Sequence, residues 1–168
     1  MDLTAAKALA VLGLVASMLS PLHGALGLIG LALYIAGMYY VAEYYGQREV
    51  FRYALASTMG FIVALIAIVL LVGLGAFLGA LTAGPIGLGA SVVAGLALAY
   101  IAVLFMGKYK RDLLKALALH SDRGIAELAA RLYWYGAILT ILLVGLALLL
   151  VAQVLEAIVL ATLRPTRQ

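Results

Sequence analysis

Residues 39–53 read Tyr-Tyr-Val-Ala-Glu-Tyr-Tyr-Gly-Gln-Arg-Glu-Val-Phe-Arg-Tyr and form the first cluster of charge in an almost wholly apolar chain. Long apolar segments flank this stretch on both sides. Its aromatic residues are typical of a membrane–water interface, where amphipathic rings sit at the level of the headgroups. Two arginines one helical turn apart indicate a cytoplasmic face. The stretch therefore predicts a connector between membrane hairpins, with lipid or interface contacts from Tyr39, Tyr40, Tyr44, Tyr45, Arg48 and Arg52.

Composition sets the class of protein. The 168 residues are 67% hydrophobic and 11% charged, with a mean hydropathy of +1.21. Soluble domains are roughly 45–50% apolar and about 25% charged, so this chain lacks the polar surface that a water-soluble fold requires. Long apolar runs without strict alternation favour helices over a β-barrel. We expect an all-α integral membrane protein that forms one transmembrane domain over residues 1–168.

The apolar segments predict a small bundle of about five transmembrane helices, arranged as two hairpins plus a long last helix. The expected spans are residues 5–20, 24–42, 54–81, 86–106 and 133–163. Ser20-Pro21 predicts the turn of the first hairpin and Gly84-Pro85 that of the second, because glycine ends helices and proline starts them. Small residues let helix backbones approach closely in a membrane, and the second and third spans carry Gly24, Gly27, Gly30, Gly37, Gly75 and Gly79.

The connector 107–131 is the most polar region and is expected to be cytoplasmic. Its first half predicts a short amphipathic helix on the membrane surface, with leucines facing away from the charged side. Ser121-Asp-Arg-Gly then predicts a break, followed by charges at four-residue spacing. These charges fit either a solvated helix start or a contact with anionic lipid or a partner protein. The predicted interface residues here are Lys108, Lys110, Arg111, Lys115, Tyr133, Trp134 and Tyr135.

The distribution of basic residues predicts the orientation. Given five spans, nine of the eleven Lys and Arg residues fall on the amino-terminal side and only Arg164 and Arg167 on the other. Because cytoplasmic loops carry the excess of Lys and Arg, we expect a multi-pass protein of the cell membrane. Its N-terminus would be cytoplasmic and its C-terminus outside.

Several glycine-centred motifs resemble a family. Leu12-Gly13-Leu14, Gly27-Leu-Ile-Gly30-Leu and Tyr44-Tyr-Gly-Gln-Arg-Glu-Val-Phe-Arg52, together with Tyr135-Gly136 and Leu143-Val-Gly145, are similar to the archaeal membrane proteins called domain of unknown function 996. Gln47 stands where that family usually has an acidic residue, and Gln153 and Glu156 where its members are often apolar. The resemblance implies an archaeal source and a helical membrane fold, and it carries no assigned activity. The absence of cysteine and asparagine further indicates a thermophile.

No set of residues predicts catalysis, and we expect no catalytic residue, bound metal, cofactor or nucleic acid. Cysteine is absent, and the two histidines, His23 and His120, fall on opposite sides of the predicted membrane. Tyr34 and Tyr100 lie deeper in their spans than the other tyrosines. Buried tyrosine hydroxyls usually find a hydrogen-bond partner, so helix–helix hydrogen bonds are favoured over a quinone or ion site.

Glu156 is the one ionisable residue of functional interest within a predicted span. It lies in the apolar run Val-Leu-Glu-Ala-Ile-Val-Leu, with Gln153 one turn earlier on the same face. Intramembrane ionisable residues are costly and mark functional candidates. Counting about 20 residues from Gly136 alternatively places Glu156 at the outer headgroups. Its depth decides between a functional group within the bundle and an interface residue.

The sequence favours a non-catalytic scaffold or accessory subunit, associated with lipids and with itself or other membrane proteins. The alternative is a small transporter or channel, which needs a continuous polar path through the bundle. A membrane enzyme is the third class, and no reactive cluster of residues in the sequence supports it.

Overall fold

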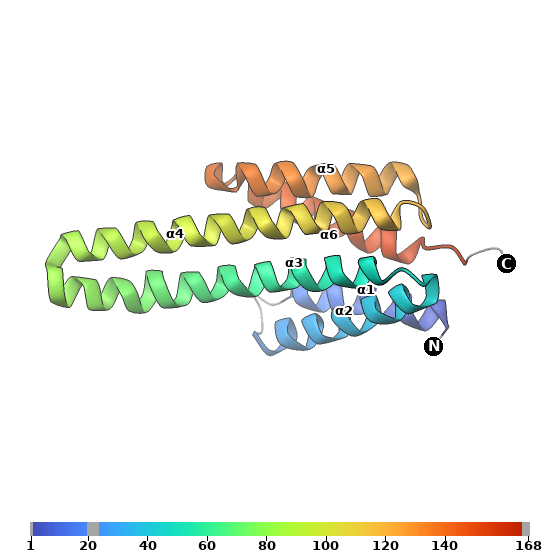
Figure 1. Ribbon diagram of the computed structural model, residues 1–168, viewed down its shortest axis with the longest axis horizontal. Coiled ribbons are helices and arrows are strands. Elements are labelled where there is room, and N and C mark those ends of the chain that lie inside the picture. The colour runs from blue at the N-terminus through green and yellow to red at the C-terminus, as the bar shows by residue number, and fades with distance from the viewer. Residues whose placement is uncertain (1, 20–23, 166–168) are drawn as a thin grey trace.

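The computed structural model describes residues 2–19 and 24–165, which within those ranges form six α-helices with one π-helical and one 3-10 segment (Figure 1). In chain order these are α1 (Leu3–Met18), α2 (Gly24–Tyr45), α3 (Arg48–Ala67), η1 (Ile68–Leu74), α4 (Gly75–Leu117), α5 (Arg123–Leu139), η2 (Thr140–Leu142) and α6 (Val144–Ala161). The predicted helical class is confirmed. Five helical segments are long and apolar enough to cross a membrane: Ala25–Tyr45, Arg48–Thr82, Gly84–Leu117, Arg123–Leu142 and Val144–Ala161. With 16 residues, α1 is shorter.

The longest feature is a hairpin made by α3, η1 and α4, which we call the long hairpin (48–117). The chain reverses direction at Gly84, where φ is 62° and ψ is −145°. Glycine adopts this left-handed conformation without steric cost, and Pro85 then begins the second arm. The predicted turn is confirmed. The tip of the long hairpin projects far beyond the ends of the other helices (Figure 1).

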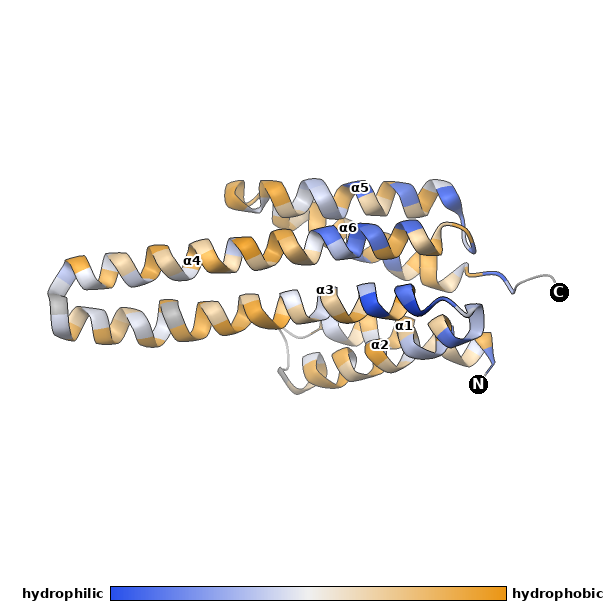
Figure 2. Cartoon of the chain, in the orientation of Figure 1, coloured by the Kyte–Doolittle hydropathy of each residue, from blue (hydrophilic) through white to orange (hydrophobic). Residues whose placement is uncertain are grey.

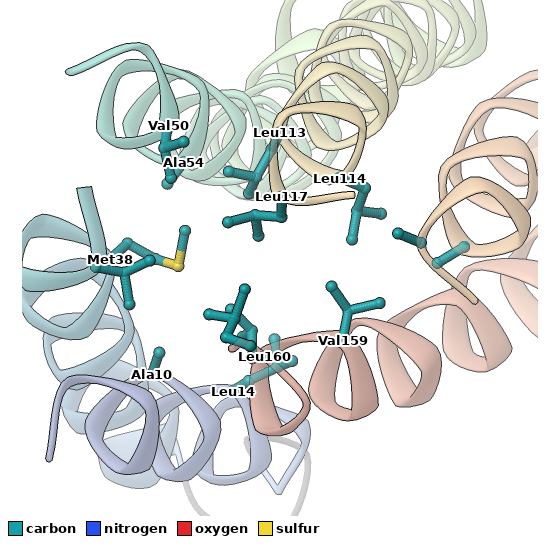
Figure 3. Packing of buried hydrophobic residues seen from close by; sticks show 14 of the residues in the cluster. Ala10, Leu14, Met38, Val50, Ala54, Leu113, Leu114, Leu117, Val159 and Leu160 are labelled. Carbon is teal, nitrogen blue, oxygen red and sulfur yellow. The ribbon is translucent and has the colours of Figure 1, made fainter. Parts of the chain in front are cut away.

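The hydrophobic core lies at the opposite end of the molecule from this tip. Buried side chains of all six described α-helices meet there, among them Leu14, Met38, Val50, Leu117 and Leu160 (Figure 3). The predicted amphipathic surface helix is wrong, because residues 108–117 continue α4. Three leucines of this segment pack in the core: Leu113, Leu114 and Leu117. Lys108 and Lys115 are exposed, whereas Lys110 is buried with the leucines.

The predicted long last helix is also wrong, because residues 133–163 contain a second reversal. Thr140–Leu142 form a 3-10 turn and Leu143 takes a left-handed conformation with φ of 59°. The two arms then approach so closely that a Cβ placed on Gly145 would lie 2.1 Å from the Thr140 backbone nitrogen. Nothing but glycine fits at that position, and α5 and α6 therefore form an antiparallel hairpin.

This extra hairpin brings the two ends of the chain together. Lys7 Nζ donates to the carbonyl oxygens of Ala161 at 3.3 Å and Leu163 at 2.8 Å, while Arg164 N donates to His120 O at 2.7 Å. N- and C-terminal regions lie at the same end of the bundle (Figure 1). The expected five-span arrangement places them at opposite ends of the bundle instead, and their orientation relative to the membrane stays a prediction. Arg167, Ser20-Pro21 and His23, on which other expectations rested, lie outside the described residues.

The first hairpin, α1 with α2, packs as closely as its small residues predict. A Cβ on Gly30 would lie 2.4 Å from the Ser17 backbone nitrogen, and one on Gly37 would lie 2.4 Å from that of Ala10. The backbones of the two helices are thus in direct contact. Most of the strongly hydrophilic residues that the structure describes gather at the end where the core lies (Figure 2). We call it the charged end.

Candidate functional site: a buried polar cluster between four helices

Four polar side chains from four different helices meet inside the bundle: Tyr34 of α2, Lys110 of α4, Tyr133 of α5 and Glu156 of α6. Lys110 Nζ lies 2.6 Å from Glu156 Oε1 and 2.8 Å from Oε2. The Tyr34 hydroxyl donates to Glu156 Oε1 at 2.7 Å, and the Tyr133 hydroxyl donates to Oε2. Lys110 Nζ also donates to the Tyr34 hydroxyl at 2.9 Å. Every donor and acceptor in the cluster faces another member.

The cluster is closed off from the surroundings. Glu156 is fully buried and Lys110 is 8% exposed, and no buried side-chain polar atom among the described residues lacks a hydrogen-bond partner. Removing two charges from water costs several kcal/mol per ion, which their attraction offsets only when the remaining hydrogen bonds are also made. The two phenols supply those bonds. The net charge of the cluster is zero, with Glu156 as carboxylate and Lys110 as ammonium.

Neighbouring residues set the depth of the cluster. Lys108 on α4 and Arg131 on α5 are exposed, each two residues from a cluster member. The cluster therefore lies at the level of the exposed cations, but inside the bundle. The alternative that placed Glu156 at the outer headgroups assumed one continuous helix after Gly136. The α5–α6 turn instead returns Glu156 to the charged end, where packing buries it.

Gln153, which was expected to act with Glu156, takes no part. It is half-buried one turn away, and no hydrogen bond within the described residues joins it to the cluster. The expectation for deep tyrosines is confirmed: Tyr34 bonds Glu156 across helices, and the Tyr100 hydroxyl donates to Ile138 O at 3.0 Å.

The predicted interface residues divide into three groups. Lys110 and Tyr133 are buried, so their assignment to the lipid interface is wrong. The exposed group comprises Tyr39, Tyr44, Arg48, Arg52, Lys108, Lys115 and Tyr135. The half-exposed group comprises Tyr40, Tyr45, Arg111 and Trp134. For these two groups lipid contact stays a prediction.

The burial of Lys110 was not predicted from the sequence, because it lies in a run of polar and charged residues. Lys108, Tyr109 and Arg111 surround it, and in such a run a single inward-facing lysine carries no distinct signal. Helical spacing offers one: Lys110 shares a face with Leu113, Leu114 and Leu117, which are all buried. A lysine on the leucine-rich face of one helix, together with a single glutamate in an apolar stretch of another, is the sequence pattern that predicts this ion pair.

A second polar contact joins the two connectors at the charged end. The His120 ring stacks on Tyr45 with centroids 3.9 Å apart, and its Nε2 lies 3.2 Å from Gln47 Nε2. Burial lowers the pKa of the His120 imidazole below its ordinary value, because desolvation disfavours the charged form. The neutral ring accepts from the Gln47 amide, so this contact ties the α2–α3 connector to the α4–α5 connector.

Five helical segments of membrane-spanning length and apolar composition indicate a helical membrane protein. The chain belongs to the family described as Protein of unknown function (DUF996), whose model matches residues 26–154. It is also similar to the uncharacterized protein MJ1644 of Methanocaldococcus jannaschii, at 26% identity over 163 residues that cover 94% of this chain and 91% of the relative. No solved structure matches.

Proposed function

We propose that the protein is a non-catalytic scaffold or accessory subunit of the cell membrane, which pairs with a second copy of itself through the long hairpin. The observation that carries this proposal is the isolation of the hairpin. Its distal arms pack only on each other, and their outer side chains are apolar and exposed, among them Val69, Phe77, Leu81, Ile86 and Val93.

The dimensions of the hairpin support a partner in the membrane. From Arg52 to the turn at Gly84 there are 32 residues, or about 48 Å of helix at 1.5 Å per residue. The hydrocarbon core is about 30 Å thick. An arm of this length crosses the core with length to spare, so it tilts or packs against other protein.

The short α5–α6 hairpin also requires contact with other protein in the membrane. Beyond Arg131, the last charge of α5, only 11 residues remain to Leu142, about 17 Å of helix. The α5–α6 turn that follows consists of exposed apolar side chains, Ile141, Leu142 and Leu143. An irregular turn at hydrocarbon depth needs protein around its backbone polar groups. A neighbouring long hairpin supplies that cover.

A second copy is the occupant that fits best. Basic residues gather at one end, so two copies insert in the same direction, and their hairpins then run side by side about a two-fold axis. The outer faces carry Gly73 and Gly89, where an added Cβ would meet nothing within the chain. Small residues on a lipid-facing surface let two helices approach closely.

Transport is the competing function, and the buried ion pair is the observation that favours it. Intramembrane charges often line substrate or proton pathways. Here, however, the cluster is neutral and fully satisfied, and the apolar core of Met38, Leu113 and Leu160 lies beside it. A scaffold agrees better with this closed arrangement than a channel does.

Cysteine crosslinking tests the proposal directly, because the chain has no native cysteine. We expect single variants Val69→Cys, Phe77→Cys and Val93→Cys to differ in native membranes, with efficient disulfide dimers at the positions nearest the axis. Leu12→Cys is the matched control, equally exposed but on α1, and should stay monomeric. Equal dimer yields at all four positions, or none, would overturn pairing through the hairpin.

Reconstitution separates scaffold from transporter. The purified protein in liposomes should pass neither protons nor small ions, measured with an internal pH dye and an ion-selective dye. Flux above that of empty liposomes, lost in Glu156→Gln, would replace the scaffold with proton- or ion-coupled transport.

A further inference from the structure

A groove between the end of α4 and the start of α5 is lined by basic residues and aromatic rings. It has a volume of about 740 Å³, within the roughly 300–1,000 Å³ of typical ligand sites. From α4 come Arg111 and Lys115, and from α5 come Arg123 and Arg131. Trp134 and Tyr135 complete the wall one helical turn beyond Arg131.

The charge of this groove is unbalanced. Four cations line it against one carboxylate, Glu127, which leaves a net charge of +3. Glu127 Oε1 accepts from Arg123 Nε at 2.8 Å, and no other ion pair within the described ranges involves a groove residue. Arg111, Lys115 and Arg131 thus face the same space without an ion pair of their own, and the single Glu127 carboxylate balances only one of the four positive charges. Like charges gathered in one groove repel each other unless an anion lies between them.

The position of the groove selects the kind of anion. It lies at the charged end, beside the predicted headgroup level, and its far wall is aromatic. Tyr135 is exposed, and the Arg111 guanidinium lies 5.6 Å from the centre of the Trp134 ring. Amphipathic rings of this kind sit at membrane interfaces. Basic pockets between helices on the cytoplasmic side are suited to anionic lipid headgroups.

We propose that this groove binds the phosphate of an anionic phospholipid headgroup, with Arg111, Lys115 and Arg131 on the phosphate and Trp134 and Tyr135 beside the upper acyl chain. Free phosphate shares the same chemistry but gains nothing from the aromatic wall. The site lies at the charged end, away from the distal arms of the long hairpin, so lipid binding and self-association are independent properties of the chain.

The single tryptophan of the chain lies in the groove and provides the measurement. In detergent micelles, brominated phosphatidylglycerol should quench Trp134 fluorescence at lower mole fractions than brominated phosphatidylcholine. The double variant Lys115→Gln/Arg131→Gln should weaken phosphatidylglycerol quenching by about fivefold for each cation removed. The matched control is Arg48→Gln/Arg52→Gln, which removes the same charge from α3. Its Trp134 fluorescence should be quenched by brominated phosphatidylglycerol as strongly as that of the parent protein.

Three results would overturn the proposal. Equal quenching by the two lipids would show that the groove does not select an anion. Equal weakening by the two double variants would show attraction to net charge rather than a site. Relief of quenching by millimolar inorganic phosphate at constant ionic strength would assign the groove to free phosphate.

Discussion

At the scale of single residues, the cluster around Glu156 carries the most chemistry in the protein. A buried lysine and glutamate from α4 and α6 are held by phenols from α2 and α5. These helices belong to all three hairpins, so the cluster fixes how the hairpins sit relative to one another. Buried polar groups stabilise such an arrangement only while every member stays paired.

Breaking the ion pair from one side should be strongly destabilising. Glu156→Leu leaves the Lys110 ammonium buried without a counter-ion, which costs about 3–5 kcal/mol. The double variant Lys110→Met/Glu156→Leu should recover most of that loss, because it removes both charges. Thermal unfolding in detergent, followed by the circular dichroism of the helices, measures the stability of the single and the double variant.

Gln153→Leu is the control for these two variants of the ion pair. It lies one turn from Glu156 on α6 but outside the cluster, so its unfolding temperature should match that of the parent protein. If Glu156→Leu proves as stable as Gln153→Leu, the ion pair does not hold the bundle together.

At the scale of elements, two turns of different kinds shape the fold. The turn at Gly84-Pro85 can be predicted from the sequence, because glycine readily adopts the left-handed conformation and proline starts the next helix. The α5–α6 turn gives no such signal, since Leu143 holds the left-handed position. A non-glycine residue there costs roughly 1–2 kcal/mol, which close packing at Gly145 offsets.

Gly145→Val should prevent the α5–α6 hairpin from closing. Its Cβ would overlap the Thr140 nitrogen and the Gly136 carbonyl oxygen, both backbone atoms that have no room to move. We expect loss of folded, monodisperse protein in size-exclusion chromatography. Ala147→Val adds a methyl-rich side chain two residues later on the exposed face and should elute like the parent protein. Similar behaviour of both variants would argue against the tight turn.

At the scale of the whole molecule, the even number of described α-helices brings both ends of the chain and both charged connectors to one end (Figure 1). No Lys or Arg occurs in the long hairpin between Tyr53 and Gly107. The described basic residues lie in α1, in the two charged connectors and the helices beside them, and after α6. The positive-inside rule then applies to the entire charged end. It predicts that both ends of the chain face the cytoplasm.

Labelling of introduced cysteines tests this orientation. Asp2→Cys and Pro165→Cys should react with a membrane-impermeant maleimide only in inverted vesicles, whereas Thr82→Cys at the hairpin tip should react only in right-side-out vesicles. Labelling of Pro165→Cys from the outside would restore the opposite arrangement of the termini.

The amino-acid sequence is sufficient to predict the helical class, the Gly84-Pro85 turn, the close α1–α2 packing and the importance of Glu156. Each of these follows from local composition or residue spacing. The fold-back within residues 133–163, the inward direction of Lys110, and the pairing of Tyr34 and Tyr133 with Glu156 become visible only in the folded chain. These features depend on contacts between helices: a leucine is held in a left-handed turn by the closeness of two backbones, and a lysine is buried because a carboxylate from a distant helix meets it.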